Sequence, residues 1–466
     1  MAEGHSVNIQ QERIKSLNSR GVVDGDYVLY WMQQSQRTEY NHALEYAAEQ
    51  ANELQLPLLV VFGLMADYPE ANLRHYTFLL EGLRDVQDNL ARRGIQLVVR
   101  FSRPPQVALE LGARAALIVC DRGYLRHQRG WRKQVAEQAA CRVMQVEADV
   151  VVPVEVASNK AEYAARTLRP KIHKHLDRFL VGLETIPVLK PSLDLAVDGI
   201  KLDDVDSVLN VLNIDRSVNP VGILYPGGES AAQARFQLFL ENSFKRYQEN
   251  RNQPQTDDVS GMAMYLHFGH VSPIQLALLA RDAETVAADN REAFLEELIV
   301  RRELSINFVQ YTQDYDAYAS LPDWSKKTLN GHRRDPRAVV YTPEQLENAE
   351  THDEYWNAAM KEMRCSGYMH NYMRMYWGKK ILEWSAAPEE AYETTLRLNN
   401  KYFLDGRDAN SYGNVAWIFG QHDRPWKERP IFGTVRYMSA AGLERKCDIQ
   451  GYVRKVEGLA REFGMF

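Results

Sequence analysis

The chain has 466 residues, of which 45% are hydrophobic, 25% charged and 10% aromatic, and its formal net charge is −6. This balance is typical of a soluble globular protein, and roughly 150 residues per domain leaves room for two or three domains. No apolar stretch approaches the roughly 18–20 residues of a membrane-spanning helix, and residues 1–20 lack the apolar core of a signal peptide. The four cysteines are far apart, which argues against a disulfide framework or a zinc knuckle. We therefore expect a cytoplasmic protein, or a nuclear one in a eukaryote, and exclude membrane, secreted and fibrous classes.

Between residues 27 and 154, short β-branched runs alternate with longer charged segments of helical period. The predicted strands cover residues 27–32, 57–62, 95–101, 115–120 and 142–146, and the predicted helices cover 39–54, 73–93, 106–111 and 129–140. Such alternation buries its apolar faces as a parallel sheet with helices on both sides. We predict a doubly wound, Rossmann-like α/β domain over residues 20–155.

The remainder of the chain divides into an irregular part and a helical part. Residues 156–230 are interrupted by proline and by a Gly-Gly pair, and we predict that they form an interdomain linker. Helical period then dominates to the end of the chain, as in 231–248, 272–286, 291–311, 355–384 and 388–401. The expected fold class is therefore α/β plus all-α, with an all-helical domain over residues 231–466.

The segment 364–384 combines aromatic, sulfur-containing and polar side chains. At 100° per residue, one stripe is shared by Met369, Met373, Trp377, Lys380 and Trp384. One interpretation is an aromatic core helix. The other is a binding face, because the segment also contains His370 and Arg374, which a plain core would exclude unless they contact a polar group. Indole rings at this spacing can also pass electrons stepwise.

Residues 398–426 contain a run of short amides and carboxylates around two glycines. Such residues suit a polar ligand, although an ordinary sequence of caps and turns would account for many of them. The nearby Trp417, Arg424 and Trp426 combine flat apolar faces with positive charge, which suits nucleic-acid bases and phosphates.

Glu297 and Arg301 are four residues apart in a predicted helix. This spacing indicates either a surface ion pair or a carboxyl group that lines a pocket. The motif His267-Phe268-Gly269-His270 is similar to the HxGH signature of class I aminoacyl-tRNA synthetases. That signature belongs just after the first strand of a nucleotide-binding sheet, whereas here the motif lies in the predicted helical half, so we set that interpretation aside.

Several long stretches, in a fixed order, resemble the class II cyclobutane pyrimidine dimer photolyases of the photolyase/cryptochrome family. These stretches are residues 30–37 (YWMQQSQR), 265–273 (YLHFGHVSP), 296–304 (EELIVRREL), 364–384 and 398–433. The resemblance implies an enzyme that binds FAD in its helical domain and repairs UV-damaged DNA with visible light. It implies that the reduced flavin, FADH⁻, donates an electron to a flipped-out dimer and so splits the cyclobutane ring.

The same resemblance implies roles for individual residues. The expected flavin cradle consists of Tyr247, Ser260, Gly261, Met262, Ala263 and Met264. Arg374 and Asp405 would form an ion pair beside the flavin ring, and Asn399 would face flavin N5. Trp377, Trp356 and Trp384 would carry electrons from the surface, with Trp377 nearest the flavin. Glu297 would bind the base edges of the dimer, and the other expected DNA contacts are Arg251, Asn252, Arg301, Tyr372, Met375, Trp417, Arg424 and Trp426.

One stretch departs from the family pattern. The family cradle reads SGLSPYLHFG, whereas this chain has SGMAMYLHFG, so Ala263 and Met264 replace a serine and a proline. The resemblance leaves open an antenna chromophore, deazaflavin or folate, in the α/β domain. It also leaves a cryptochrome-like photoreceptor as the alternative function. We expect damaged DNA as the partner, no metal, and a monomer.

Overall fold

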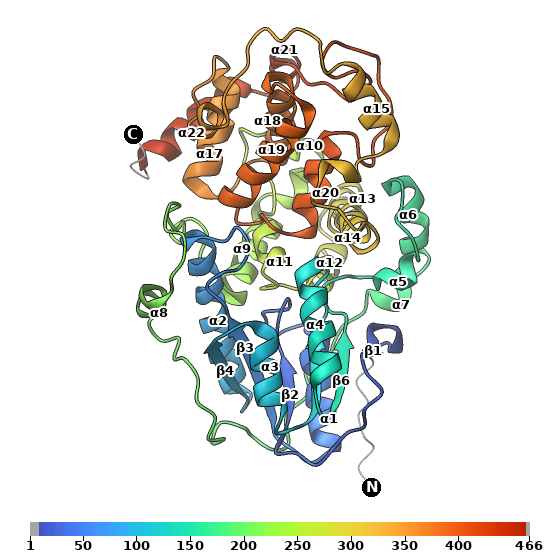
Figure 1. Ribbon diagram of the computed structural model, residues 1–466, viewed down its shortest axis with the longest axis vertical. Coiled ribbons are helices and arrows are strands. Elements are labelled where there is room, and N and C mark those ends of the chain that lie inside the picture. The colour runs from blue at the N-terminus through green and yellow to red at the C-terminus, as the bar shows by residue number, and fades with distance from the viewer. Residues whose placement is uncertain (1–8, 463–466) are drawn as a thin grey trace. The chain divides into compact units, whose positions relative to one another are not determined.

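A six-stranded sheet organises the amino-terminal part of the chain in the computed structural model, which describes residues 9–462 (Figure 1). The chain forms two compact units, each assembled from separate segments. Unit 1 comprises residues 1–159, 171–236 and 262–282, and unit 2 comprises residues 160–170, 237–261 and 283–466. The chain therefore passes from one unit to the other several times, whereas each expected domain was one continuous segment.

The sheet of unit 1 has the order β1-β6-β5-β2-β3-β4. Its strands are β1 (Ile14–Ser16), β2 (Tyr27–Trp31), β3 (Leu58–Leu64), β4 (Gln96–Phe101), β5 (Ala115–Asp121) and β6 (Arg142–Val146). All five predicted strands are confirmed, and all five pair in parallel. The sequence analysis missed β1, which pairs antiparallel with β6 at the sheet edge and is too short to carry a pattern. The predicted α/β fold is confirmed.

Helices cover both faces of this sheet, as alternation along β2 requires. Val28 and Tyr30 pack with residues of α1 (His42–Glu53) and α2 (Leu73–Arg92), whereas Leu29 packs with residues of α3 (Pro104–Gly112) and α4 (Arg126–Gln138).

The helices between β6 and residue 262 are α5 (Val154–Ala157), α6 (Ala165–His173), α7 (Leu176–Phe179), α8 (Val205–Val211), α9 (Glu229–Asn242) and α10 (Tyr247–Asn250).

Much of the expected linker packs onto unit 1. Helix α8 contacts α2, and the extended segment that precedes it lies along the outer edge of β4, where Ile200 N–H donates to Val99 O at 2.7 Å. The Ser192 hydroxyl accepts from Gln96 N–H at 2.8 Å. An exposed sheet edge promotes aggregation, so this segment protects the edge of β4.

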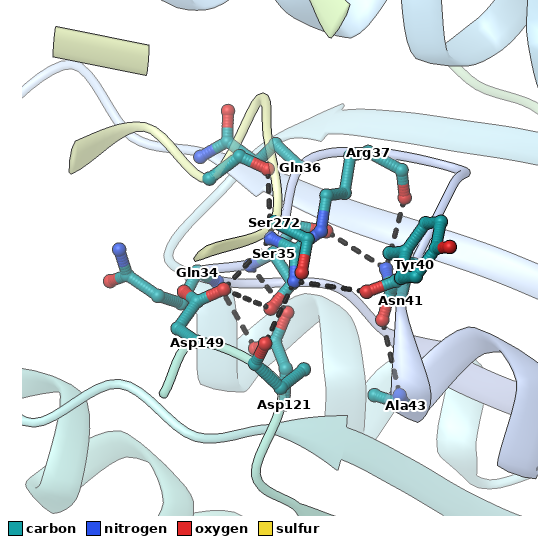
Figure 2. A network of polar contacts seen from close by, with 12 residues as sticks. Gln34, Ser35, Gln36, Arg37, Tyr40, Asn41, Ala43, Asp121, Asp149 and Ser272 are labelled. Atoms are coloured by element: carbon teal, nitrogen blue, oxygen red, sulfur yellow. Dashed lines mark hydrogen bonds and ion pairs between the residues drawn. The ribbon is translucent and has the colours of Figure 1, made fainter. Parts of the chain in front are cut away.

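A buried carboxylate organises the loop at the point where the sheet order reverses (Figure 2). Asp121, at the end of β5, accepts hydrogen bonds from the backbone N–H groups of residues 33–35, which follow β2, at 2.9–3.1 Å. Arg37 donates to Asp149 at 2.8 Å and to the Gly269 carbonyl at 3.1 Å. A Cβ on Gly269 would lie 1.8 Å from the Gln34 carbonyl oxygen, so only glycine fits there. The glycine of the HxGH-like motif (residues 267–270) is thus explained by its close packing against the loop after β2.

The rest of the chain is helical. The helices are α11 (Ala263–His267), α12 (Pro273–Arg281), α13 (Ala288–Leu295), α14 (Arg302–Tyr311), α15 (Asp323–Gly331), α16 (Pro343–Glu347), α17 (Glu354–Ser366), α18 (Asn371–Trp384), α19 (Pro388–Tyr402), α20 (Ala409–Ile418), α21 (Ala440–Glu444) and α22 (Ile449–Glu462). The predicted helix 355–384 is two helices, because Gly367 adopts a left-handed conformation (φ 70°) that ends α17. Met369 therefore lies outside α18, and the predicted stripe begins at Met373.

Candidate functional site

Glu297 lies in a π-helical segment, Glu296–Arg301, inserted between α13 and α14. The wider turn aligns residues five apart, so Arg301 pairs with Glu296 at 3.1 Å and the predicted Glu297–Arg301 spacing on an α-helix is wrong. Glu297 instead pairs with Arg251, at the end of α10, at 3.0 Å, and its side chain is 42% exposed. Glu297 therefore forms no ion pair with Arg301, and its carboxyl group is partly exposed. Single π-turns within α-helices are frequent at functional sites because they displace one side chain from the helical pattern.

Arg374 and Asp405 form a bidentate ion pair between α18 and the turn that follows α19. The two N–O distances are 2.9 and 3.0 Å, and the side chains are only 18% and 15% exposed. The Arg374 Nε donates to the Met369 carbonyl at 2.9 Å, and the guanidinium lies 3.9 Å from the centre of the Phe403 ring. A planar guanidinium with these three contacts has one orientation. The pairing expected from the resemblance is thus present in the structure.

The turn after α19 orients Asn399. The Asn399 Nδ2 donates to Asn400 Oδ1 at 3.1 Å, and the same oxygen accepts from Arg407 N–H at 2.9 Å. Arg407 has a left-handed backbone (φ 63°), a strained conformation that is common at functional sites. With its amide nitrogen engaged, Asn399 can present its carbonyl Oδ1 as an acceptor to a ligand.

Three tryptophans from α17 and α18 form a buried connected group. The rings of Trp356 and Trp384 are 5.6 Å apart at 70°, and Trp356 Nε1 donates to the Trp377 carbonyl at 2.9 Å. Phe403 joins this group to Arg374, because its ring is 6.3 Å from Trp377. All three indoles are at most 3% exposed, so none of them is the surface end of an electron route.

Arginine and tryptophan form a second cluster near α20. The Arg436 guanidinium lies 5.3 Å from the Trp417 ring and 4.2 Å from the Trp426 ring, and Arg424 lies 5.5 Å from Trp426. Asp423 holds Arg436 through two hydrogen bonds of 2.8 and 3.0 Å. Burial alone would raise the pKa of Asp423, but the hydrogen bonds from Arg436 outweigh it and keep this pKa below its usual range. Trp426 is 40% exposed, so part of this cluster faces solvent.

A buried lysine supports Trp417 from α18. Lys379 Nζ donates to the Ile418 carbonyl and lies 5.5 Å from the Trp417 ring. Burial lowers the pKa of Lys379 to about 7. The sequence analysis missed Asp423, Arg436 and Lys379; only their closeness to tryptophan in the fold identifies them.

The remaining predicted residues lie in different settings. Tyr372 is buried in the first turn of α18, where His370 Nδ1 accepts its N–H, and Met375 is half-buried one turn later. Asn252 is exposed after α10, and Tyr247 packs edge-on against Phe294 at 5.5 Å. Tyr247, Ser260 and Gly261 belong to unit 2, and Met262, Ala263 and Met264 belong to unit 1. Ala263 is exposed, whereas Met262 and Met264 are buried.

Two buried donors show that the region around α18 suits a bound group. Trp377 Nε1 and His370 Nε2 are both buried and have no hydrogen-bond partner within residues 9–462. A buried unpaired donor is costly, and a polar ligand would remove that cost. Within the same residues, no cluster of His, Cys, Asp and Glu could hold a metal ion, and no helix is long and apolar enough to cross a membrane.

Glu347 on α16 fixes the helix that carries Asn399. Its carboxylate accepts from Lys401, Arg397 and Tyr402 at 2.6–2.7 Å. Burial alone would raise the pKa of Glu347, but these three bonds outweigh it and lower the pKa to about 2.

Glu347→Gln is expected to destabilise the protein by about 1–3 kcal/mol at pH 7. Because the folded pKa is depressed, the stabilisation is present above about pH 4.5, the ordinary pKa of the group, and is lost as pH falls toward about 2. Urea unfolding of both proteins at pH 7 and at pH 3 measures this, and the difference should shrink at pH 3. A constant difference would contradict the assignment.

Comparison with known proteins gives a consistent result. The DNA photolyase family model matches residues 28–191. The deoxyribodipyrimidine photo-lyase of Methanothermobacter thermautotrophicus is 49% identical, over 97% of this chain and 100% of that protein. The protein of the same name from Oryza sativa is 40% identical, over 96% and 91%. Among solved structures, a class III photolyase from Agrobacterium tumefaciens has a TM-score of 0.73 at 16% identity, covering 93% of this chain and 87% of that one, which is a likeness of fold.

Proposed function

Because the chain belongs to the DNA photolyase family, we propose that it repairs cyclobutane pyrimidine dimers in DNA in a light-dependent reaction, as the class II enzymes do. The observation that carries this proposal is the convergence on Phe403. Its ring contacts both the Arg374 guanidinium, which is paired with Asp405, and Trp377, the first member of a buried tryptophan group. An oriented ion pair and a group of tryptophans suited to electron transfer therefore both contact Phe403 within unit 2.

These residues suit FAD, the cofactor of the family. Bound FAD, in its reduced form and excited by light, supplies the electron that splits the dimer. Arg374 and Asp405 would orient the ring system, and Asn399 Oδ1 would hold a proton at flavin N5. The unpaired Nε1 of Trp377 and Nε2 of His370 would donate to acceptors of the bound group.

The second cluster suits a flipped-out dimer. An enzyme that acts on bases within a duplex must extrude them, and a dimer, already weakly stacked and paired, costs least to extrude. Trp417 offers an indole face for stacking, and its position is fixed by Arg436 and Lys379. The exposed Trp426 and Arg424 would occupy the gap in the duplex and bind phosphate, while Glu297 would accept hydrogen bonds from base edges.

The test is illumination of duplex DNA that contains one thymine dimer, with the purified holoenzyme reduced beforehand. We expect two separate thymines to appear in the light and none in darkness. Persistence of the dimer while FAD stays bound and reduced would refute the proposal. Equal affinity for damaged and undamaged duplexes would instead favour a cryptochrome-like receptor.

Glu297→Ala is expected to weaken binding of dimer-containing DNA by about 10–100-fold, because a charged hydrogen-bond acceptor contributes about 1.5–3 kcal/mol. Fluorescence anisotropy with a labelled duplex measures this. The matched control is Glu292→Ala, an exposed acid on α13, which should bind as the wild type does. Equal weakening in both variants would mean that Glu297 has no specific contact.

A further inference from the structure

The loop that carries Trp426 has a fixed shape. It comprises residues 424–434 of unit 2, and Trp426 N–H donates to the Thr434 carbonyl at 2.8 Å, so the two ends of the loop lie side by side. At its turn, Ile431 adopts a left-handed backbone (φ 69°), which is a strained conformation for a β-branched residue. Such strain persists only where the surrounding structure holds the backbone in place.

Helix α15 and the residues after it supply that support. Asp335 Oδ2 accepts the N–H of Ile431 at 2.8 Å, and the Thr328 hydroxyl accepts the N–H of Thr434 at 2.9 Å. Thr328 lies on α15, and Asp335 follows the end of that helix. The loop is therefore held from outside both at its turn and at its second end.

His332 joins the same support to the outer part of the loop. Its Nδ1 lies 2.6 Å from Asp335 Oδ2, and its Nε2 lies 2.9 Å from Glu428 Oε1. An ionised carboxylate only accepts hydrogen bonds, and a neutral imidazole has a single N–H, so a neutral ring would leave one nitrogen lone pair facing a carboxylate. Only the imidazolium, with an N–H on each nitrogen, satisfies both contacts.

The titration behaviour of the groups agrees with this protonation state. The hydrogen bonds to Asp335 and Glu428 raise the pKa of His332 above its usual value. The Ile431 N–H and His332 lower the pKa of Asp335, which keeps that carboxyl group ionised.

Two arginines near His332 have other partners. Arg333 pairs with Glu389 on α19. Arg337 donates to the backbone carbonyl of Asp335 at 3.1 Å, and its positive charge further lowers the pKa of the Asp335 carboxyl group. The imidazole is therefore the cation that faces the two carboxylates.

Glu428 lies among cations. Residues 424–430 (RPWKERP) contain Arg424, Lys427 and Arg429, and all of them are exposed. Cations suit the DNA backbone, whereas a free carboxylate at the same place repels phosphate. The imidazolium neutralises this carboxylate and holds it toward α15. Because Glu428 is 68% exposed, its position depends on that contact.

We propose that His332, as an imidazolium, is a positioning residue for DNA binding. It neutralises Glu428 and supports Asp335, so that the loop presents Trp426 and its cations to the damaged duplex. The inference rests on the proposed function, in which this loop fills the gap left by the extruded dimer.

This role makes DNA binding depend on pH. Because the folded pKa of His332 is raised, its two contacts are complete below about pH 6.5, the ordinary pKa of the group, and are lost as pH rises through the raised value. At higher pH the Glu428 carboxylate is released toward the phosphates, and the turn of the loop loses one of its supports. Affinity for DNA therefore falls toward alkaline pH.

The experiment compares the full-length holoenzyme with its His332→Asn variant in binding a duplex that contains one thymine dimer. Fluorescence anisotropy in darkness, at constant ionic strength, gives both affinities at pH 6 and at pH 9. The variant should bind about 3–10-fold more weakly than the wild type at pH 6, and about equally at pH 9. Burial lowers the pKa of Lys379 to about 7, so Lys379 titrates in the same range. The readout is therefore the ratio of the two affinities at each pH rather than the wild-type slope.

Glu428→Gln tests the same contact from its other side and keeps the inference testable if His332→Asn does not fold. It should bind about as tightly as the wild type at pH 6, where the imidazolium neutralises Glu428, and about 3-fold more tightly at pH 9. In the Glu428→Gln background, His332→Asn should weaken binding at pH 6 much less than it does alone, because the two residues act through one contact. His352→Asn is the matched control, since His352 contacts Tyr341 instead, and it should follow the wild type at both pH values.

Nuclear magnetic resonance of protein with ¹³C-labelled histidine measures the protonation directly. The signal that disappears in His332→Asn should titrate above pH 6.5 in the wild type and at a lower pH in Glu428→Gln. A neutral ring at pH 6, or an affinity ratio that is the same at pH 6 and at pH 9, would overturn the inference. Failure of the proposed function appears differently, as dimers that persist in the light whatever the affinity ratio.

Discussion

Trp377→Phe is expected to reduce light-driven reduction of oxidised FAD to background while leaving repair by chemically reduced enzyme at its normal rate. The physical reason is that a phenyl ring is much harder to oxidise than an indole, so electron transfer from the residue expected nearest the flavin would fail. Phenylalanine keeps the packing against Phe403, which is 6.3 Å away. Absorbance of the flavin under blue light with a thiol donor measures the first effect, and a dimer-repair assay after dithionite reduction measures the second.

The control for this prediction is Trp324→Phe, which makes the same chemical change on α15, away from the tryptophan group. Its photoreduction should match the wild type. Normal photoreduction in Trp377→Phe would show that electrons reach the flavin by another route. Loss of repair in the prereduced variant would show that Trp377 serves in binding as well as in electron transfer.

Much of the fold follows from local patterns. The β-branched runs of β2 and β5 stand out because parallel strands are buried on both faces, and their order with the helices predicts the doubly wound sheet. Strand β1 has only three residues and is defined by pairing with β6, so no local pattern could reveal it. The end of α17 at Gly367 was not predicted within residues 355–384. A left-handed glycine ends a helix without changing the polarity pattern of the residues around it, so the helical period continues across it.

The candidate site divides in the same way. Residues in the matching stretches, such as Arg374 and Asp405, could be named from the resemblance, and the structure confirms their pairing. The partner of Glu297 could not, because one extra residue in a helical turn changes which side chains align. Arg436 contacts the ring of Trp417 through the tertiary fold, and no local sequence pattern links the two residues.

Arg374→Ala is expected to cost about 3–5 kcal/mol of stability, because it leaves the mostly buried Asp405 carboxylate without its partner. The same change should abolish retention of FAD during purification, since the guanidinium and the carboxylate together orient the expected ring site. Urea unfolding of the flavin-free protein measures the first effect, and the ratio of flavin to protein absorbance measures the second.

The double variant Arg374→Met, Asp405→Leu separates these two effects. Replacing a mostly buried ion pair by apolar side chains of similar size is often neutral or stabilising, so its unfolding free energy should return toward that of the wild type. Affinity for FAD should not return, because neither charge is restored. Arg461→Ala serves as the control, since Arg461 is 81% exposed in its pair with Glu457 and should change stability by less than about 0.5 kcal/mol. A double variant that binds FAD normally would show that the ion pair supports only the fold, because the flavin would then be held without either charge.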